Sequence, residues 1–346
     1  MRNFFLGLIV WALLFTACDR RDRLYVYNWA YFIPHSILNQ FEQEFNVSIV
    51  LDEYASNEET FAKLQTMGTS GRVYDIVFPS EDFVPLMVNE GMLAELDHSR
   101  IPNLRYINPI VVEMMFYDPG MKFAVPYAIG AAAIIVNTAM VPEFEESWNI
   151  FARDDLKGRM TLLDDLRETI GGALLYLGYS VNSTNPDEIN EAAELILNNW
   201  VPNLLRFDAG SFGRAFASGD AWVVHGWPEN VFEEIDGDEE LIASTAFCFP
   251  REGVPGYIDN MVILRHGRNQ ELAHEFLNFI HRPEIYAIFL DEFKYPTTIN
   301  LYAREFMTQE PLYSEHDIYG AELKDGLGEG ISLFHSAWFD RIRIGN

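Results

Sequence analysis

From Leu24 onward, short strand-like runs alternate with amphipathic helical stretches. Residues 24–27, 47–51 and 75–79 are typical of strands, because they are short, rich in β-branched or aromatic residues and bounded by polar or turn-forming residues. Between the first two, apolar residues recur every three or four positions, as on one face of a helix. This alternation predicts an α/β fold with mainly parallel sheets flanked by helices.

The chain has 346 residues, which is more than a single hydrophobic core usually serves, so we expect two lobes. The apolar run at residues 131–136 suits a buried strand that carries the chain into the second lobe, and residues 259–264 suit a return strand. No low-complexity linker separates the lobes, so crossing strands should join them. We predict residues 24–132 and 260–300 in lobe 1, and residues 133–259 and 301–346 in lobe 2.

The first residues predict an export signal. A basic start precedes an apolar run at residues 4–15, which is too short to span a bilayer. Leu14-Phe15-Thr16-Ala17-Cys18 resembles a bacterial lipobox, although Phe15 replaces the usual aliphatic residue. We therefore predict a lipoprotein signal peptide at residues 1–17, lipidation of Cys18 and a linker at residues 18–23. An ordinary signal peptide with an incidental cysteine is the alternative.

Charge and cysteine content narrow the function. The formal net charge of −28 repels nucleic acid and anionic lipid headgroups and attracts cations. If Cys18 carries lipid, Cys248 has no cysteine partner, so neither a disulfide framework nor a cysteine-based metal site is expected. No GxGxxG or P-loop motif follows an expected strand, and we predict no cofactor.

A pair of acids follows the expected strand end at residues 162–163. Asp165 and Glu168 are three positions apart at the start of a helical pattern, so both carboxylates can face the same space. The carboxyl ends of strands are where ligands bind in open α/β sheets. The alternative is structural: an aspartate caps the helix and a glutamate complements its dipole.

Aromatic and acidic residues recur near the other expected strand ends. An aromatic face attracts an ammonium by about 0.5–2 kcal/mol, and a carboxylate adds a charge-assisted hydrogen bond. A methylene chain that carries two or more amines needs both kinds of partner. Each aromatic residue alone is more often part of a core than of a site, but their recurrence favours a site formed by Trp29, Phe32, Ser80, Asp82, Asp165, Glu168, Trp227, Tyr257 and Asp259.

Over nearly all of the mature chain, the sequence resembles the periplasmic spermidine/putrescine-binding proteins of polyamine ABC importers. The resemblance rests on Tyr27-Asn28-Trp29, Ser56-Asn57-Glu58, Pro79-Ser80, Pro126-Tyr127, residues 165–168, Gly226-Trp227 and Tyr295-Pro296. It implies a two-lobed, type II periplasmic-binding-protein fold that closes on putrescine or spermidine. It also implies a monomer that delivers its ligand to an ABC permease and its ATPase.

The resemblance also implies roles for individual residues. Trp29, Trp227 and Tyr295 match an aromatic box, Asp165, Glu168 and Asp259 match amine-binding acids, and Ser80 matches a hydroxyl at the lobe edge. Five positions depart from the pattern: Phe32 replaces Tyr, Ala30 and Tyr31 replace a polar-acidic pair, Tyr257 replaces the usual Trp, and Asp82 stands where spermidine binders have Tyr. The preference between putrescine and spermidine therefore stays open, and residues 323–330 align too loosely to assign a contact.

Two other functions remain open. A secreted hydrolase could use Asp165 and Glu168 as a carboxylate pair, although no HExxH motif appears and the histidines are scattered. The same fold could instead carry another cationic solute, ferric iron or an amino acid. Iron carriers generally use paired tyrosines, and amino-acid carriers need an arginine for the carboxylate. The acids and aromatics of the expected site favour a polyamine carrier, not an enzyme.

Overall fold

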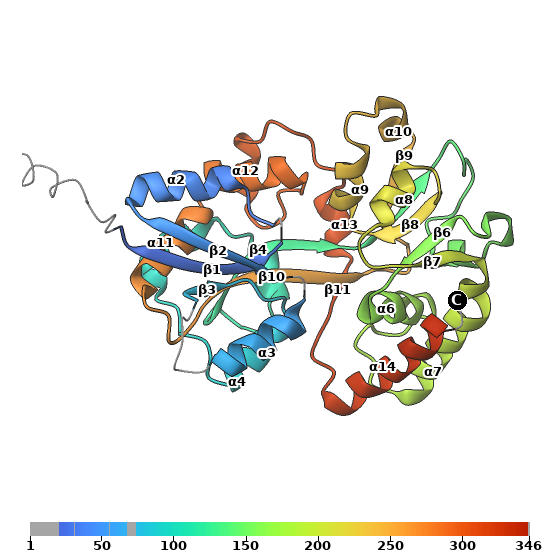
Figure 1. The fold of residues 1–346 in the computed structure, drawn as a ribbon, viewed down its shortest axis with the longest axis horizontal. Coiled ribbons are helices and arrows are strands. Elements are labelled where there is room, and N and C mark those ends of the chain that lie inside the picture. The colour runs from blue at the N-terminus through green and yellow to red at the C-terminus, as the bar shows by residue number, and fades with distance from the viewer. Residues whose placement is uncertain (1–20, 31, 55, 68–73, 345–346) are drawn as a thin grey trace, which may run out of the picture.

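The computed structural model describes residues 21–344 except 31, 55 and 68–73. The predicted signal peptide and Cys18 lie outside the described residues. Figure 1 shows two bodies side by side, each built on its own sheet. The predicted α/β class is confirmed.

The first sheet has the order β11-β10-β3-β1-β2, with β4 paired to β10. Strand β1 lies parallel to β2 and β3, whereas β10 lies antiparallel to β3 and β4. The parallel strands place their carboxyl ends at one edge of this sheet. The strands are β1 (Arg23–Trp29), β2 (Ser48–Tyr54), β3 (Ile76–Val77), β4 (Ala124–Ala131), β10 (Pro255–Ile263) and β11 (Glu322–Leu323).

The second sheet has the order β7-β6-β8-β5-β9. Strand β6 lies parallel to β7 and β8, and β5 lies antiparallel to β8 and β9. Its strands are β5 (Ala133–Asn137), β6 (Met160–Leu163), β7 (Leu204–Asp208), β8 (Val223–Gly226) and β9 (Thr245–Cys248).

Two strand pairs carry the chain between the sheets. Strand β4 ends at Ala131 in the first sheet and β5 begins at Ala133 in the second, so the apolar run at residues 131–136 crosses between the bodies, as predicted. Strand β9 returns to the first sheet through β10. The predicted lobe boundaries themselves stay a prediction.

Strand β10 differs from the sequence-based expectation. It begins at Pro255 and not at Asp259, because it pairs with β4 from Gly256 to Val262. Tyr257 and Asp259 therefore lie within a strand and do not follow one. All nine residues of β10 are buried, so no alternation of polar and apolar residues marks the strand in the sequence.

Helices cover both sheets. In Figure 1, α2 and α12 lie on one side of the first sheet and α3 and α4 on the other. Helix α7 (Pro186–Leu195) continues as a π-helical turn, Ile196–Trp200. The helices are α2 (His35–Phe45), α3 (Asn57–Met67), α4 (Phe83–Asn89), α5 (Pro109–Met114), α6 (Leu166–Tyr176), α7 (Pro186–Leu195), α8 (Phe212–Ala217), α9 (Pro228–Ile235), α10 (Glu239–Ala243), α11 (Gln270–Ile280), α12 (Pro283–Phe293), α13 (Glu315–Tyr319) and α14 (Glu329–Ile344).

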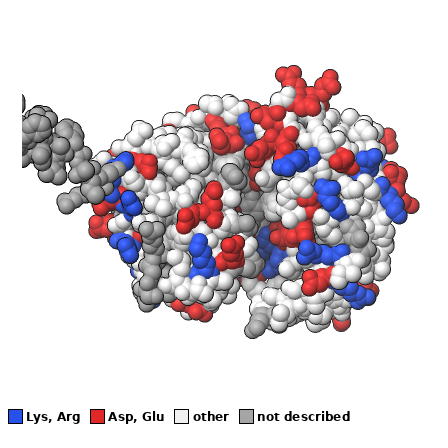
Figure 2. Space-filling view, in the orientation of Figure 1, with Lys and Arg blue, Asp and Glu red and all other residues white. Residues whose placement is uncertain are grey.

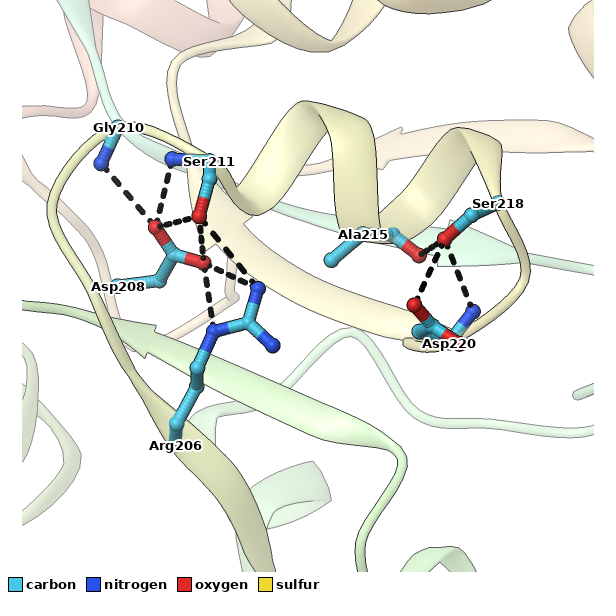
Figure 3. A network of polar contacts seen from close by, with 7 residues as sticks. All are labelled: Arg206, Asp208, Gly210, Ser211, Ala215, Ser218 and Asp220. Carbon is cyan, nitrogen blue, oxygen red and sulfur yellow. Dashed lines mark hydrogen bonds and ion pairs between the residues drawn. The ribbon is translucent and has the colours of Figure 1, made fainter.

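A hydrogen-bonded turn joins β7 to α8 (Figure 3). The Asp208 carboxylate accepts hydrogen bonds from the Ser211 backbone N–H at 2.6 Å and from Arg206 Nη2 at 2.7 Å. Although burial works against the charge, these bonds lower the pKa of Asp208. Its carbonyl oxygen accepts from the Asp164 N–H at 3.1 Å, which fixes the turn that leads into Asp165.

The C-terminal segment packs on the second body. Helix α14 lies against α6 and α7 (Figure 1), and Trp338 Nε1 donates to Asn190 Oδ1 at 2.7 Å. Within the described part of the chain, no helix combines the length and the apolar character that crossing a bilayer requires.

Candidate functional site

The first body contributes Asp259 and Ser80. A register shift between Asp259 and Asn260 interrupts the β10–β4 ladder, and Ser80 forms an isolated bridge with Asp259. Ser80 Oγ donates to Asp259 Oδ1 at 2.6 Å and accepts from Asn57 Nδ2 at 3.0 Å. Burial raises the pKa of Asp259 to about 7, although the Ser80 hydroxyl and the charge of Lys324 oppose the shift. The Asp259 carboxyl is thus costly to ionise without a further cation.

Glu81, which the sequence interpretation missed, lies beside these residues. It is fully buried, and its Oε2 accepts from the Ile258 backbone N–H at 2.9 Å. Its Oε1 is buried without a hydrogen-bond partner. Burial raises the pKa of Glu81 to about 8; the charge of Lys324 lowers it and that of Asp82 raises it. Its position next to Ser80, which was predicted in the site, is the sequence feature that could have indicated it.

The second body contributes Asp165 and Glu168 from the start of α6. Asp165 Oδ1 caps the helix by accepting from the N–H groups of Arg167 at 2.8 Å and Glu168 at 3.0 Å. Glu168 is 1% exposed, and its Oε2 is buried without a partner. Burial raises the pKa of Glu168. Asp165 is therefore a helix cap, as the structural alternative expected, and it also holds a second acid at the site.

A chain of hydroxyls and a carboxylate connects the two bodies. The hydroxyls of Tyr257 and Tyr295 lie 2.8 Å apart, and Tyr295 Oη donates to Glu229 Oε1 at 2.7 Å. Tyr295 follows α12 in the first body, whereas Glu229 belongs to α9 in the second. Burial raises the pKa of Glu229. Glu229, two residues after Trp227, was also missed by the sequence interpretation.

The remaining aromatic residues occupy different surroundings. Trp29 ends β1 and packs on Tyr54 with ring centroids 4.7 Å apart. Trp227 precedes α9, is partly buried and lies 6.0 Å from the Phe212 ring. Phe32 packs in a first-body aromatic cluster, 5.6 Å from Tyr127. The direct contact of each with a ligand stays a prediction.

A lysine that the sequence interpretation did not assign lies among these acids. Lys324 Nζ forms an ion pair with Glu168, and the Lys324 side chain is 13% exposed. Burial opposes the ammonium charge, but Glu168, Glu81 and Asp165 together raise the pKa of Lys324 above its ordinary value. Lys324 follows the two-residue strand β11, which is too short for a periodic pattern to reveal.

The site can thus hold ammonium groups between two sheets. Figure 2 shows the surface hollowed between the bodies. Among the described residues, no group of three or more histidine, cysteine, aspartate or glutamate side chains is placed to hold a metal ion. The structure brings together Ser80, Asp82, Asp165, Glu168, Asp259 and the unassigned Glu81 and Lys324, as their bonds and mutual charge effects show.

Comparison with known proteins agrees with this geometry. Residues 36–313 match the family model described as bacterial extracellular solute-binding protein. The spermidine/putrescine-binding periplasmic protein of Escherichia coli is 31% identical over 334 residues, covering 94% of this chain and 93% of that protein. The putrescine/cadaverine-binding protein of Pseudomonas aeruginosa is 32% identical over 269 residues, covering 75% of this chain and 74% of that protein.

A solved structure is similar over almost the full length. The crystal structure of the TpPotD lipoprotein of Treponema pallidum superposes with a TM-score of 0.89 at 42% identity, covering 93% of this chain and 100% of that one. The predicted resemblance to polyamine-binding proteins and the predicted type II fold are confirmed. The chain belongs to the bacterial extracellular solute-binding protein family.

Proposed function

We propose that this chain captures putrescine or spermidine between its two bodies and delivers it to an ABC permease. Two buried carboxylate oxygens without hydrogen-bond partners, Glu81 Oε1 and Glu168 Oε2, carry the proposal. They lie close to Asp259, whose carboxyl is unfavourable to ionise because burial raises its pKa. Buried polar groups normally have partners. A polyamine supplies N–H donors and positive charge together, so it satisfies such a site where a neutral or anionic solute does not.

The aromatic residues suit the rest of such a ligand. Tyr257, Trp29 and Trp227 offer apolar faces to methylene groups and attract ammonium groups. The Tyr295–Glu229 hydrogen bond gives the two bodies a contact near the site. A ligand that contacts both bodies therefore favours their approach.

The same proposal covers attachment and partners. The lipobox-like sequence at residues 14–18 supports a lipid anchor at Cys18, which holds the protein at a bacterial membrane. The names of the relatives support a location outside the cytoplasm and a permease with its ATPase as partner. We propose a monomeric carrier and not an enzyme, since Glu168 of the carboxylate pair is engaged by Lys324.

Calorimetric titration of the purified protein with putrescine, spermidine, cadaverine and arginine tests the function. We expect one polyamine per chain, no binding of arginine, and recovery of unchanged ligand by mass spectrometry. Asp259→Asn should weaken the binding of every polyamine, whereas the matched control Asp22→Asn, at an exposed position, should not. Failure of every polyamine to bind would reject the proposal, and turnover of a ligand would favour an enzyme.

A further inference from the structure

Lys324 lies inside the proposed polyamine site, although it carries the same charge as the ligand. Strand β11 pairs in parallel with β10, with Leu323 opposite Gly256, so Lys324 comes next to Tyr257. Lys324 Nζ lies 5.9 Å from the centroid of the Tyr257 ring. The lysine side chain therefore reaches the site from the segment that leads from β11 in the first sheet to α14 on the second body.

The chemistry of this side chain matches part of the proposed ligand. A lysine side chain is four methylenes ending in an ammonium, which is the aminobutyl group found in putrescine and spermidine. Lys324 ends on the buried carboxylate of Glu168, beside an aromatic ring. Its charge also reaches Glu81 and Asp259. The protein thus places one tethered aminobutyl group in its own amine site.

The backbone on both sides of Lys324 is fixed to the second body. Asn182 Nδ2 donates to the Leu323 carbonyl at 2.8 Å, and the Asp325 N–H donates to Asn182 Oδ1 at 2.8 Å. Arg167 Nη1 donates to the Asp325 carbonyl at 2.9 Å. These bonds hold the main chain while the side chain spans to Glu168. These backbone bonds keep Lys324 next to Glu168.

We propose that Lys324 determines specificity: its ammonium fills the position at Glu168 that a third ligand ammonium needs, so the chain binds diamines in preference to triamines. This inference rests on the proposed polyamine function. A diamine leaves the ion pair between Lys324 and Glu168 Oε1 in place, donates to the partnerless Glu168 Oε2, and uses the charges of the remaining acids, Asp165, Asp259 and Glu81. A triamine must either displace Lys324 or place a like charge beside it, and close like charges disfavour binding.

The test compares putrescine and spermidine affinities, measured by calorimetry, in the wild type, Lys324→Gln and the control Lys122→Gln. Lys122 is 52% exposed and pairs with Glu95. We expect the wild type to bind putrescine more tightly than spermidine. In Lys324→Gln the ratio of spermidine to putrescine affinity should rise on the order of tenfold or more, and Lys122→Gln should leave the ratio unchanged.

The outcomes separate this inference from the function on which it rests. Absence of polyamine binding by the wild type overturns both. Wild-type binding of spermidine as tight as that of putrescine overturns the role of Lys324 alone, and this result does not depend on the folding of a variant. An equal change in the putrescine and spermidine affinities of Lys324→Gln also overturns the role of Lys324, because Lys324 then affects both ligands alike and does not discriminate a diamine from a triamine.

Discussion

Lowering the pH should weaken putrescine binding, because the acids of the site must lose protons to receive the ligand. Burial raises the pKa of Asp259 from 3.8 to about 7 and that of Glu81 from 4.5 to about 8. At pH 7, about half of the Asp259 carboxyls and most of the Glu81 carboxyls in the ligand-free protein therefore carry a proton. A bound diammonium ligand favours both carboxylates, so binding should release protons.

The magnitude follows from these pKa values. If Asp259 alone ionises on binding, the apparent affinity for putrescine should fall about tenfold between pH 8 and pH 6. Ionisation of Glu81 as well would make the fall steeper. The number of protons released is measured by titrating at pH 6, 7 and 8 in buffers with different ionisation enthalpies. In Asp259→Asn, fewer protons should be released and the pH dependence should flatten.

The same pKa shifts make the stability of the ligand-free protein depend on pH. Asp259 and Glu81 hold protons more tightly in the folded than in the unfolded chain, so their contribution to folding is present at low pH. It is lost as the pH rises through about 7 and 8, the folded-state pKa values. Saturating putrescine should therefore raise the melting temperature more at pH 8 than at pH 6. The same affinity at pH 6 and pH 8, with binding enthalpies that do not depend on the buffer, would refute this reasoning.

Three further predictions concern the anchor, the ligand contacts and the motion of the two bodies. Cys18→Ser should leave the protein in the aqueous phase of a detergent partition, because the lipid is its proposed anchor; wild-type partitioning would contradict this. Asp165→Asn should weaken putrescine binding by about 2–5 kcal/mol if Asp165 neutralises a buried ammonium, whereas Trp227→Ala should weaken putrescine and spermidine equally, by about 0.5–2 kcal/mol; calorimetry checks both, and unchanged affinities would remove these residues from the site. Small-angle scattering should show a smaller radius of gyration with putrescine and a larger ligand-free radius in Tyr295→Phe, which loses the hydrogen bond to Glu229; identical curves would mean that neither ligand nor bond draws the bodies together.

Part of the site could be predicted from the sequence because strand ends have a recognisable pattern. Ser80 follows β3 and Asp165 follows β6, and each turn comes after a short apolar strand. Trp227 follows β8 in the same way. The carboxyl ends of parallel strands meet at one edge of a sheet, so residues far apart in the chain could be placed together without knowledge of their contacts.

Tyr257 and Asp259 were also predicted in the site, but the strand-end reason for them was wrong, and Glu81 and Glu229 were not predicted. Tyr257 and Asp259 lie inside β10, where their separation of two positions places them on one face of the strand. Continuous burial hides that face from any pattern of hydrophobicity. Glu81 and Glu229 sit beside residues that were predicted, but an acid near a strand end is usually a solvated side chain, and only the fold shows that Glu81 is fully buried and Glu229 half-buried.

Lys324 and the protonated carboxyls of Asp259 and Glu81 both reduce the repulsion among the acids of the site. Several carboxylates brought together in a buried space repel one another and lose hydration, so they cannot all remain charged without a cation. The ammonium of Lys324 pairs with Glu168, and burial raises the pKa values of Asp259 and Glu81, which favours their neutral forms. The protons can leave when a ligand arrives, whereas the lysine remains covalently attached. Ligand affinity should therefore depend on pH through the first-body acids, while the number of ligand charges that the site accepts depends on Lys324.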